Sequence, residues 1–446
     1  MDAGRRAAFE IIDASLREGA FAHLAAKAEL RLLEEQDRAF ATELYNGTLD
    51  KLVRIDWTLG HFLPKTRVQG RVKNLLRLGA YQILFMDRVP DSAACNTTVQ
   101  LTKDCGKGAL AGFVNGVLRT VAREGKELPL PSEDLNPMLH WSVRASLPLW
   151  LTELWVKSYG WDIARAMMAY EPEHGVTSVW ANAARGYSPA RLKEELSAAG
   201  YVLQQGALAK DALQVVRGGN LAAHPLFRAG AFSIQGEASQ WIGELIASFQ
   251  PESVWDACAA PGGKTARIIQ GCPATRVLAT DVHEHRVNLV SSMALRLGLE
   301  GIESRQWDAR EPLPGNPRFS VVLLDAPCSG LGTLESNPDI KFHKTMDNLR
   351  EMAALQAILL QNAADHVLLG GILAYTTCTL NPAENEEQVS AFLQSRKDFE
   401  LLSWPHLLPK GLDPARLGLG LQLFPHLDKT DGFYIALLKK SGESNA

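Results

Sequence analysis

The spacing of apolar residues divides the chain into a helical first part and a later part in which strands and helices alternate. Between residues 5 and about 126, apolar side chains recur every three or four positions, as at Phe9, Ile12 and Leu16. Glycine and proline separate these periodic segments, and residues 127–137 carry three prolines without any period. We therefore predict an all-α bundle over residues 1–130, followed by a linker.

Residues 138–235 combine helical and strand-like patterns. The apolar run 147–155 predicts a helix that ends near Gly160. Ser188 and Pro189 are a favourable N-cap and first residue for a second helix, which Gly200 would end. Together with strand-like stretches, these helices predict a small α+β domain. The strand-like stretches lie at 176–182 and 212–216.

From residue 236 to 441, strand-like and helical segments alternate regularly. This is the βαβ pattern of a doubly wound α/β domain. The run 319–324 is nearly all apolar, as in a parallel strand that is covered on both faces. The predicted strands are 253–257, 276–281, 319–325 and 371–377, and the predicted helices are 264–270, 284–297 and 348–368.

Reactive side chains follow two of these strands. Asp325 ends one strand and Cys328 comes three residues later, while Cys378 directly follows the strand 371–377. Ligands of open α/β sheets bind outside the carboxyl ends of the strands, so these residues form a candidate reactive centre. A lone cysteine at a strand end is usually a small buried hydrophobe, and we keep that interpretation for the side chains of Cys258 and Cys272.

The first strand of this domain runs into a turn of small residues, Asp-Ala-Cys-Ala-Ala-Pro-Gly-Gly-Lys-Thr at 256–265, which opens a helix. Such a turn lets backbone amides approach a ligand closely. Cys258 stands where a P-loop requires glycine, and the dinucleotide fingerprint is absent. Asp281 ends the second strand, where an acid commonly binds a ribose hydroxyl, and Asp308 follows the segment 302–307. Each acid alone could be a helix cap or turn residue, but the ordered set favours a nucleoside cofactor without triphosphate, and S-adenosylmethionine fits best.

Composition narrows the class of protein. The 446 residues are 46% hydrophobic and 22% charged, and their net charge is −4, as in ordinary soluble proteins. We find no secretory signal and no apolar run long enough for a transmembrane helix. The six cysteines show neither zinc-ligand nor disulfide spacing, so we expect no metal and a cytoplasmic protein. Basic residues cluster at 65–77, either as a solvated helix face or as a phosphate-binding patch.

Several motifs of this chain resemble those of a known family. The turn 256–265, Leu-Leu-Asp-Ala-Pro-Cys-Ser-Gly at 323–330, Tyr-Thr-Thr-Cys-Thr at 375–379 and Asp-Gly-Phe at 431–433 resemble the RNA cytosine-5 methyltransferases. The likeness covers residues 230–440 in the order of the family.

The first part of the chain also resembles a known module. Asp37-Arg-Ala-Phe40 and the stretches 77–84 and 113–119 are similar to the NusB-type RNA-binding helical domain. The combination is typical of the bacterial Sun/Fmu (RsmB) branch of the family, whose substrate is the RNA of the small ribosomal subunit (16S). The resemblance thus implies an all-α NusB-like bundle, a small α+β domain and a Rossmann-like class I methyltransferase domain.

The resemblance also implies the roles of individual residues. Cys378 would be the nucleophile, Cys328 would assist product release, and Asp325 would recognise the target base. The chain is expected to act on ribosomal RNA as a monomer, without metal or membrane. S-adenosylmethionine would be held by Cys258, Ala259, Ala260, Pro261, Gly262, Gly263 and Lys264, with Asp281 at the ribose, Asp308 at the adenine and Asp325 nearby.

Three alternatives remain open. The same chemistry could act on transfer RNA, or the chain could be a non-catalytic RNA-binding factor. Methylation of an amino group is disfavoured because such enzymes carry Asn/Asp-Pro-Pro-Tyr where this chain has Asp-Ala-Pro-Cys at 325–328. Two departures concern RNA docking: residues 334–338 lack the basic pair that the family often has, and Trp180 stands where arginine is common.

Overall fold

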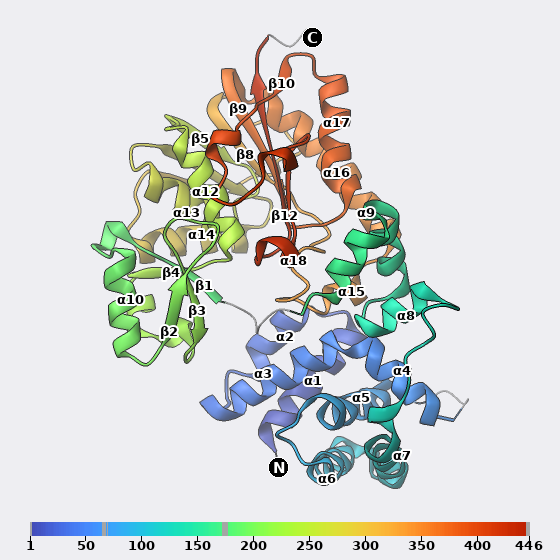
Figure 1. The fold of residues 1–446 in the computed structure, drawn as a ribbon. Coiled ribbons are helices and arrows are strands. Elements are labelled where there is room, and N and C mark those ends of the chain that lie inside the picture. Colours follow the sequence, from blue (N-terminus) through green and yellow to red (C-terminus); the bar gives the residue numbers. More distant parts are fainter. Residues whose placement is uncertain (1, 65–67, 69, 172–176, 443–446) are drawn as a thin grey trace. The chain divides into compact units, whose positions relative to one another are not determined.

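The computed structural model describes residues 2–64, 68, 70–171 and 177–442, which form two compact units (Figure 1). The first unit comprises Met1–Ala169 and Leu334–Thr345, and the second comprises Tyr170–Thr333 and Met346–Ala446. Residues 138–169, expected in a middle domain, belong to the first unit. The division into three domains therefore stays a prediction.

The first unit is helical throughout its main elements, as the apolar spacing predicts. Phe9 and Ile12 are fully buried in its core, together with Leu44 and Leu76. The helix expected to end near Gly160 is instead kinked there, because this glycine adopts a left-handed conformation (φ +75°) and the chain resumes as helix beyond it. The helices are α1 (Ala3–Glu18), α2 (Ala22–Glu29), α3 (Glu35–Asp50), α4 (Leu52–Phe62), α5 (Gly70–Phe85), α6 (Asp91–Thr102), α7 (Ala111–Glu124), α8 (Pro137–Arg144), α9 (Leu149–Ala169) and α15 (Ile340–His343).

Residues Leu334–Thr345, which we call the docked segment, are built into the helical unit although they follow the Cys328 turn in sequence. The buried carboxylate of Asp339 accepts a hydrogen bond from the backbone N–H of Ala22, the first residue of α2 (2.8 Å). The buried ammonium of Lys341 donates to the carbonyl oxygen of Asp50, the last residue of α3 (2.8 Å). An acid at a helix N-terminus and a base at a C-terminus both complement the helix dipole. The docked segment thus caps two helices of this unit.

The second unit begins with a four-stranded sheet in the order β2-β3-β1-β4. The side chain of Ser188 accepts a hydrogen bond from the backbone of Arg191, which confirms the predicted helix start. The two outer strands, β2 and β4, were not predicted because they are only four and three residues long. The elements are β1 (Thr177–Ala181), α10 (Pro189–Ala198), β2 (Val202–Gln205), β3 (Ala212–Arg217), α11 (Pro225–Arg228) and β4 (Phe232–Ile234).

The larger sheet of this unit confirms the predicted βαβ alternation. Its strand order is β10-β12-β9-β8-β5-β6-β7, with β11 paired to β12. The five strands from β9 to β7 are parallel, and β12 joins β9 antiparallel. The strands are β5 (Ser253–Asp256), β6 (Arg276–Asp281), β7 (Ile302–Gln306), β8 (Phe319–Asp325), β9 (Val367–Thr377), β10 (Phe399–Leu401), β11 (Leu421–Leu423) and β12 (Phe433–Lys440).

Helices cover both faces of this sheet (Figure 1). Val321 and Leu323 of β8 join the core formed with α12 and α13, whereas Val322 and Leu324 join the core formed with α16 and α17. Burial on both faces explains why the strand reads as a continuous apolar run rather than an alternating one. The helices are α12 (Glu237–Ser248), α13 (Gly263–Gly271), α14 (Glu284–Leu297), α16 (Met346–Asp365), α17 (Glu386–Ser395) and α18 (Pro425–Asp428).

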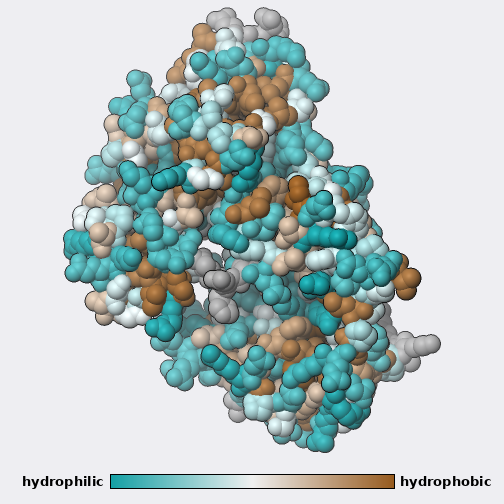
Figure 2. Space-filling model, in the orientation of Figure 1, coloured by the Kyte–Doolittle hydropathy of each residue, from teal (hydrophilic) through white to brown (hydrophobic). Residues whose placement is uncertain are grey.

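The face of the molecule in Figure 2 is mainly hydrophilic, with smaller hydrophobic areas between the polar ones. Of the most exposed large apolar side chains, Leu32 and Leu135 lie in turns between helices and Leu295 lies near the end of the helix Glu284–Leu297. No helix in the described part of the chain has the length and apolar character needed to cross a membrane.

We predict that Lys341→Met destabilises the helical unit. The change removes the cation from the end of α3 and leaves the carbonyl of Asp50 without its partner. Because the Asp50 carboxylate is 44% exposed and can be rehydrated, we expect a loss of about 1–3 kcal/mol, less than for a fully buried pair. Urea denaturation of the full chain, followed by far-UV circular dichroism, measures it.

The matched control is Arg350→Met, which breaks an exposed ion pair with Asp347 on α16. It should change the free energy of unfolding by less than about 0.5 kcal/mol, because exposed pairs contribute little. Equal stability of Lys341→Met and the wild type would show that the Lys341 contact does not stabilise the helical unit.

Candidate active site

The carboxyl ends of neighbouring parallel strands bring the predicted site residues to one edge of the larger sheet. β8 lies between β5 and β9, and β6 lies on the other side of β5. Asp256, Asp281 and Asp325 end β5, β6 and β8. Cys378 directly follows β9. Since parallel strands end at the same edge, the sheet gathers residues that lie far apart in sequence at the place where such sheets bind ligands.

Two thiols meet at this edge. The sulfur atoms of Cys328 and Cys378 are 3.3 Å apart, and both residues are free, half-buried cysteines. Their turns are joined by backbone hydrogen bonds from Ala326 N to Thr376 O (2.8 Å) and from Gly332 N to Cys378 O (3.0 Å). The hydrogen bond with Cys378, desolvation and nearby negative charge raise the pKa of Cys328 well above its usual value. Ionisation of Cys328 is therefore disfavoured, and either sulfur can be the donor in the contact between the two thiols.

Asp325 is fixed by two partners. Its carboxylate accepts hydrogen bonds from the ammonium of Lys264 (2.7 Å) and from the hydroxyl of Thr376 (2.8 Å). The Lys264 ammonium also lies 4.9 Å from the ring centroid of Phe433, within range of a cation–π interaction. Phe433 is the first residue of β12, whereas Asp431 precedes the strand. These contacts join all four sequence motifs.

The turn after β5 has the shape of a ligand cradle. Gly262 has a left-handed conformation (φ +102°), and a Cβ there would lie 3.2 Å from the Cα of Val290. Only glycine suits this position. Helix α13 begins at Gly263 without a side-chain cap, so N–H groups of its first turn are available to a ligand. A cis peptide joins Ala260 to Pro261 in the same turn.

Asp256 at the end of β5 supplies a buried acceptor. Its Oδ2 accepts a hydrogen bond from the Thr265 hydroxyl (2.5 Å), whereas its buried Oδ1 has no partner among the described residues. Burial raises the pKa of Asp256 to about 7, with the charges of Asp325 and Asp281 adding to the effect and the Thr265 hydrogen bond opposing it. Burial also raises the pKa of Cys258, which stays a neutral thiol, as expected for a small hydrophobe. An unpaired carboxylate oxygen beside a cradle of amides suits an amino acid ligand.

The two further acids lie at the ends of adjacent strands. Asp281 is buried, and it accepts a hydrogen bond from the backbone of His283 (3.1 Å) and pairs with Arg286 (3.4 Å). Asp308 follows β7 by two residues, and its carboxylate accepts hydrogen bonds from the guanidinium of Arg310. These hydrogen bonds lower the pKa of Asp308. No three His, Cys, Asp or Glu side chains of the described residues gather closely enough to hold a metal ion.

Comparison with known proteins identifies the family. Residues 245–439 match the family model described as 16S rRNA methyltransferase RsmB/F, and residues 2–123 match the NusB family. The probable ribosomal RNA small subunit methyltransferase B of Bacillus subtilis is 36% identical over 92% of this chain and 92% of its own length. The chain belongs to the RsmB/F family. It is an RNA methyltransferase with a NusB-type helical part.

Solved structures agree with this assignment. The crystal structure of PH0851 matches 99% of this chain and 99% of its own chain, at 25% identity and a TM-score of 0.81. A methyltransferase homolog protein from Pyrococcus horikoshii matches 68% of this chain and 99% of its own, at 27% identity and a TM-score of 0.56. The fold class expected from the sequence is thus confirmed.

Several polar residues around the two thiols of this RsmB/F family member were not predicted. The buried carboxylate of Glu384 accepts hydrogen bonds from Ser329, which follows Cys328, and the Ser329 hydroxyl lies 2.7 Å from that of Thr379. The only signal in the sequence is the polar run Asn-Pro-Ala-Glu-Asn-Glu at 381–386, directly after the second thiol motif. The spacing of these residues does not predict that they form a buried hydrogen-bond network.

Three of the five basic residues of the cluster at 65–77 form ion pairs within the helical unit. Arg71 pairs with Glu10 (2.9 Å), and Lys73 and Arg77 both pair with Asp56 (2.9 and 2.6 Å). These three cations are therefore engaged within the helical unit, which does not support the phosphate-binding interpretation for them. The other two members, Lys65 and Arg67, lie outside the described residues.

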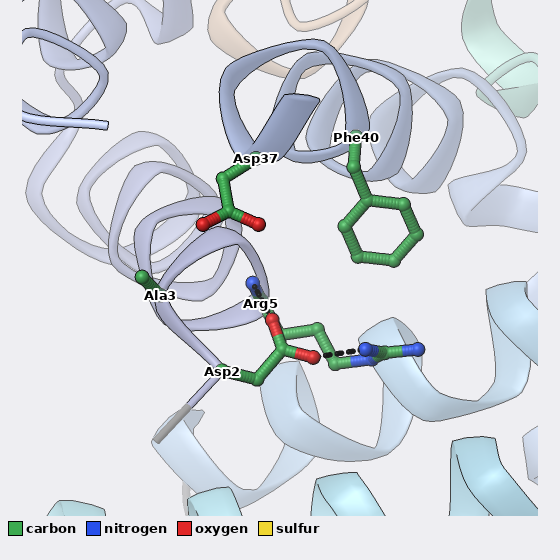
Figure 3. A pocket seen from close by; sticks show the side chains of 5 residues that line it. All are labelled: Asp2, Ala3, Arg5, Asp37 and Phe40. Carbon is green, nitrogen blue, oxygen red and sulfur yellow. Dashed lines mark hydrogen bonds and ion pairs between the residues drawn. The ribbon is translucent and has the colours of Figure 1, made fainter. Parts of the chain in front are cut away.

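One of the quoted NusB-type stretches lines a hollow of about 420 Å³ on the helical unit (Figure 3). Arg5 forms an ion pair with Asp2, and its guanidinium lies 4.8 Å from the ring centroid of Phe40. Arg5 also donates to Gln82 (2.6 Å), so it ties α1 to α3 and α5. These contacts give Phe40 a structural role. The hollow is lined by Asp2, Ala3, Arg5, Asp37 and Phe40.

The departure at Trp180 also has a structural explanation. Trp180 is fully buried and donates its indole N–H to Gln235 (2.7 Å), and the guanidinium of Arg267 lies 5.4 Å from its ring centroid. The guanidinium of Arg267, from α13, thus lies near the position at which the family commonly has an arginine. The other departure, at 334–338, lies in the docked segment of the helical unit.

The raised pKa of Asp256 predicts a pH dependence of stability. An unfolded chain releases this proton near pH 3.9, and the folded chain near pH 7, so the folded state binds more protons between these values. Stability contributed by this group therefore falls as pH rises from about 4 to 7. Relative to the wild type, Asp256→Asn should gain about 3 kcal/mol between pH 5 and pH 8.

Urea denaturation of both proteins at the two pH values, followed by tryptophan fluorescence, measures this gain. Asp347→Asn, which changes an 81% exposed carboxylate on α16, is the control and should show no such trend. A stability difference between Asp256→Asn and the wild type that stays constant with pH would contradict the raised pKa.

Proposed function

We propose that this chain transfers a methyl group from S-adenosylmethionine to carbon 5 of a cytosine in small-subunit ribosomal RNA, through a covalent bond between Cys378 and carbon 6 of the base. The observation that carries the proposal is the pair of thiols 3.3 Å apart, next to Asp325 at the ligand-binding edge of the sheet. Membership of the RsmB/F family supports it.

The chemistry explains why a thiol is needed. Carbon 5 of cytosine is a weak nucleophile, and addition of the Cys378 thiolate at carbon 6 converts the ring to an enamine whose carbon 5 is reactive. After methylation, loss of the carbon 5 proton and elimination of the thiol restore the aromatic ring. This divides one difficult step into easier ones, as covalent catalysis generally does.

Cys328 and Asp325 have distinct roles in this scheme. Cys328, which keeps its proton because its pKa is raised, is suited to assist release of the product from Cys378 rather than to attack the base. Asp325 would accept a hydrogen bond from the base near ring nitrogen 3 and favour its protonated form. The Lys264 and Thr376 contacts hold the Asp325 carboxylate in one orientation for this purpose.

The cradle at 256–265 fits the methionine part of the cofactor. Its amides would bind the carboxylate, and the unpaired Oδ1 of Asp256 is an acceptor of the kind that an ammonium group needs. Asp281 would bind the ribose and Asp308 the adenine, where the Arg310 guanidinium is its present partner. When bound, S-adenosylmethionine supplies an electrophilic methyl group. The proposed contacts are Cys258, Ala259, Ala260, Pro261, Gly262, Gly263, Lys264, Asp281, Asp308 and Asp325.

The relatives and the geometry of the site support an RNA substrate. The Bacillus subtilis relative is named a small subunit ribosomal RNA methyltransferase, and the NusB family match is consistent with RNA binding. A base that reaches Cys378 must leave its stack, so the target is an accessible loop or partly unfolded RNA. Transfer RNA is the alternative substrate, and a non-catalytic role would not require the two thiols to meet.

We predict that Cys378→Ala abolishes methylation. Without the nucleophile, incorporation of labelled methyl groups into protein-free 16S ribosomal RNA should fall by at least about a thousandfold. Cys272→Ala, which changes a buried cysteine next to Gln250 rather than at the thiol pair, should retain activity. Full activity of Cys378→Ala would refute the assigned nucleophile. Nucleoside analysis of the wild-type product must give 5-methylcytidine rather than N4-methylcytidine, and transfer RNA in a parallel reaction must stay unlabelled.

We predict that Cys328→Ala accumulates a covalent complex with RNA. The nucleophile remains, but the thiol that assists release is gone, so the adduct at Cys378 should persist. Denaturing gel electrophoresis after incubation with RNA and S-adenosylmethionine should show a slowly migrating species that the wild type lacks. Its absence in Cys328→Ala, when the double variant with Cys378→Ala behaves identically, would count against the release role.

A further inference from the structure

Glu384 is a fully buried carboxylate that binds Ser329, the residue after Cys328. It lies in the short helical turn Pro382–Glu384, which follows Cys378 in sequence. Its oxygens accept hydrogen bonds from the backbone N–H (2.8 Å) and the hydroxyl (2.5 Å) of Ser329, from Asn381 (2.9 Å) and from Gln356 (3.0 Å). Each carboxylate oxygen therefore accepts two hydrogen bonds, as a buried polar group requires.

These contacts connect the two cysteine-bearing turns through one group. Ser329 directly follows Cys328, and its hydroxyl lies 2.7 Å from the hydroxyl of Thr379, which directly follows Cys378. Gln356, which donates to Glu384, also donates to the carbonyl of Pro327 (2.9 Å), directly before Cys328. Pro327 and Ser329, the two sequence neighbours of Cys328, are therefore both linked to Glu384: Ser329 directly and Pro327 through Gln356.

Glu384 also affects the thiols through its charge. All of its side-chain partners are neutral, and within the described residues it forms no ion pair. Of the cations at this edge, Lys264 is paired with Asp325 and Arg286 with Asp281. The charge of Glu384 contributes to the raised pKa of Cys328, after the hydrogen bond to Cys378, desolvation and the charge of Cys378.

Tyr375 of β9 is a further titratable neighbour. Its hydroxyl donates to the carbonyl oxygen of Glu384 (2.6 Å), and burial raises its pKa, so it stays neutral. Among the described residues, the charges that bear on the pKa of Cys328 are those of Cys378 and Glu384, and neither is a cation. A negative charge beside a thiol disfavours its ionisation, and this bias is stronger in a desolvated site.

We propose that Glu384 is a positioning residue that locks the Cys328 turn against the Cys378 turn and keeps the proton of the thiol pair on Cys328, leaving Cys378 as the sulfur that attacks. The nucleophilic role of Cys378 in this inference rests on the proposed function, but the location of the proton can be tested without RNA. It explains how two chemically identical side chains 3.3 Å apart acquire different roles.

The test compares the rates at which iodoacetamide alkylates the two cysteines in the full chain without RNA. Peptide mass spectrometry at low extents of modification gives the ratio of Cys328 to Cys378. In the wild type, Cys378 should react faster. In Glu384→Gln, which removes the charge but keeps the size, the ratio should rise about tenfold, equivalent to a change of about one pKa unit.

Two variants separate charge from structure. Glu384→Asp keeps the charge on a shorter side chain, so it should retain a ratio close to that of the wild type even if methylation slows. Glu387→Gln changes an exposed carboxylate at the start of α17 and should alter neither the ratio nor the activity. Thermal denaturation of each variant establishes that it is folded before its ratio is compared.

The outcomes are decisive. A ratio that rises in Glu384→Gln alone supports the proposal, whereas an unchanged ratio, or equal changes in Glu384→Gln and Glu384→Asp, overturns it. Faster alkylation of Cys328 than of Cys378 in the wild type overturns it without any variant. If instead the ratio behaves as expected but Cys378→Ala methylates RNA normally, the placement of the proton stands and the proposed function fails.

Discussion

The ion pair between Lys264 and Asp325 is the interaction on which the arrangement of the candidate site depends. Lys264 is only 8% exposed, and a buried ammonium without a partner costs several kcal/mol. The 2.7 Å contact with Asp325 meets this requirement and also joins the turn after β5 to the end of β8. The Phe433 ring beside the ammonium adds the start of β12. The cradle proposed for the cofactor and the group proposed to recognise the base are thus held by a single electrostatic contact, and neither can move without weakening it.

The parallel pairing of β8 and β9 sets the second constraint. Asp325 is opposite Thr376 in the register of the two strands, and Thr376 donates to the Asp325 carboxylate. A shift of one residue would place the neighbouring side chains on the opposite face of the sheet. The turns that follow the strands then bring the two sulfur atoms within 3.3 Å, where Glu384 and Ser329 hold them. Geometry from the sheet and charge from one buried carboxylate together distinguish the thiols.

The sequence predicted the elements whose apolar pattern is strong. The run 319–324 is buried on both faces of the sheet, and this is why β8 could be located nearly to the residue. Strands β2 and β4 were not predicted because three or four residues carry too little periodicity. The kink at Gly160 was interpreted as a helix end because glycine is common both at helix ends and at kinks. The thiols and Asp325 were recognisable from motifs. Glu384 was not, because its partners at Ser329 and Gln356 are brought to it only by the fold.

The docked segment shows a kind of organisation that local sequence patterns cannot express. Thr333 is the last residue of the Cys328 turn region in the methyltransferase unit, and Leu334 is the first of a stretch whose Asp339 and Lys341 cap helices of the other unit. Charges that would be solvated in an isolated loop are buried there, because two helix ends supply their partners. The helical unit thus includes a stretch that lies between the two thiol motifs in sequence. The ends of its helices α2 and α3 supply the partners with which Asp339 and Lys341 are buried.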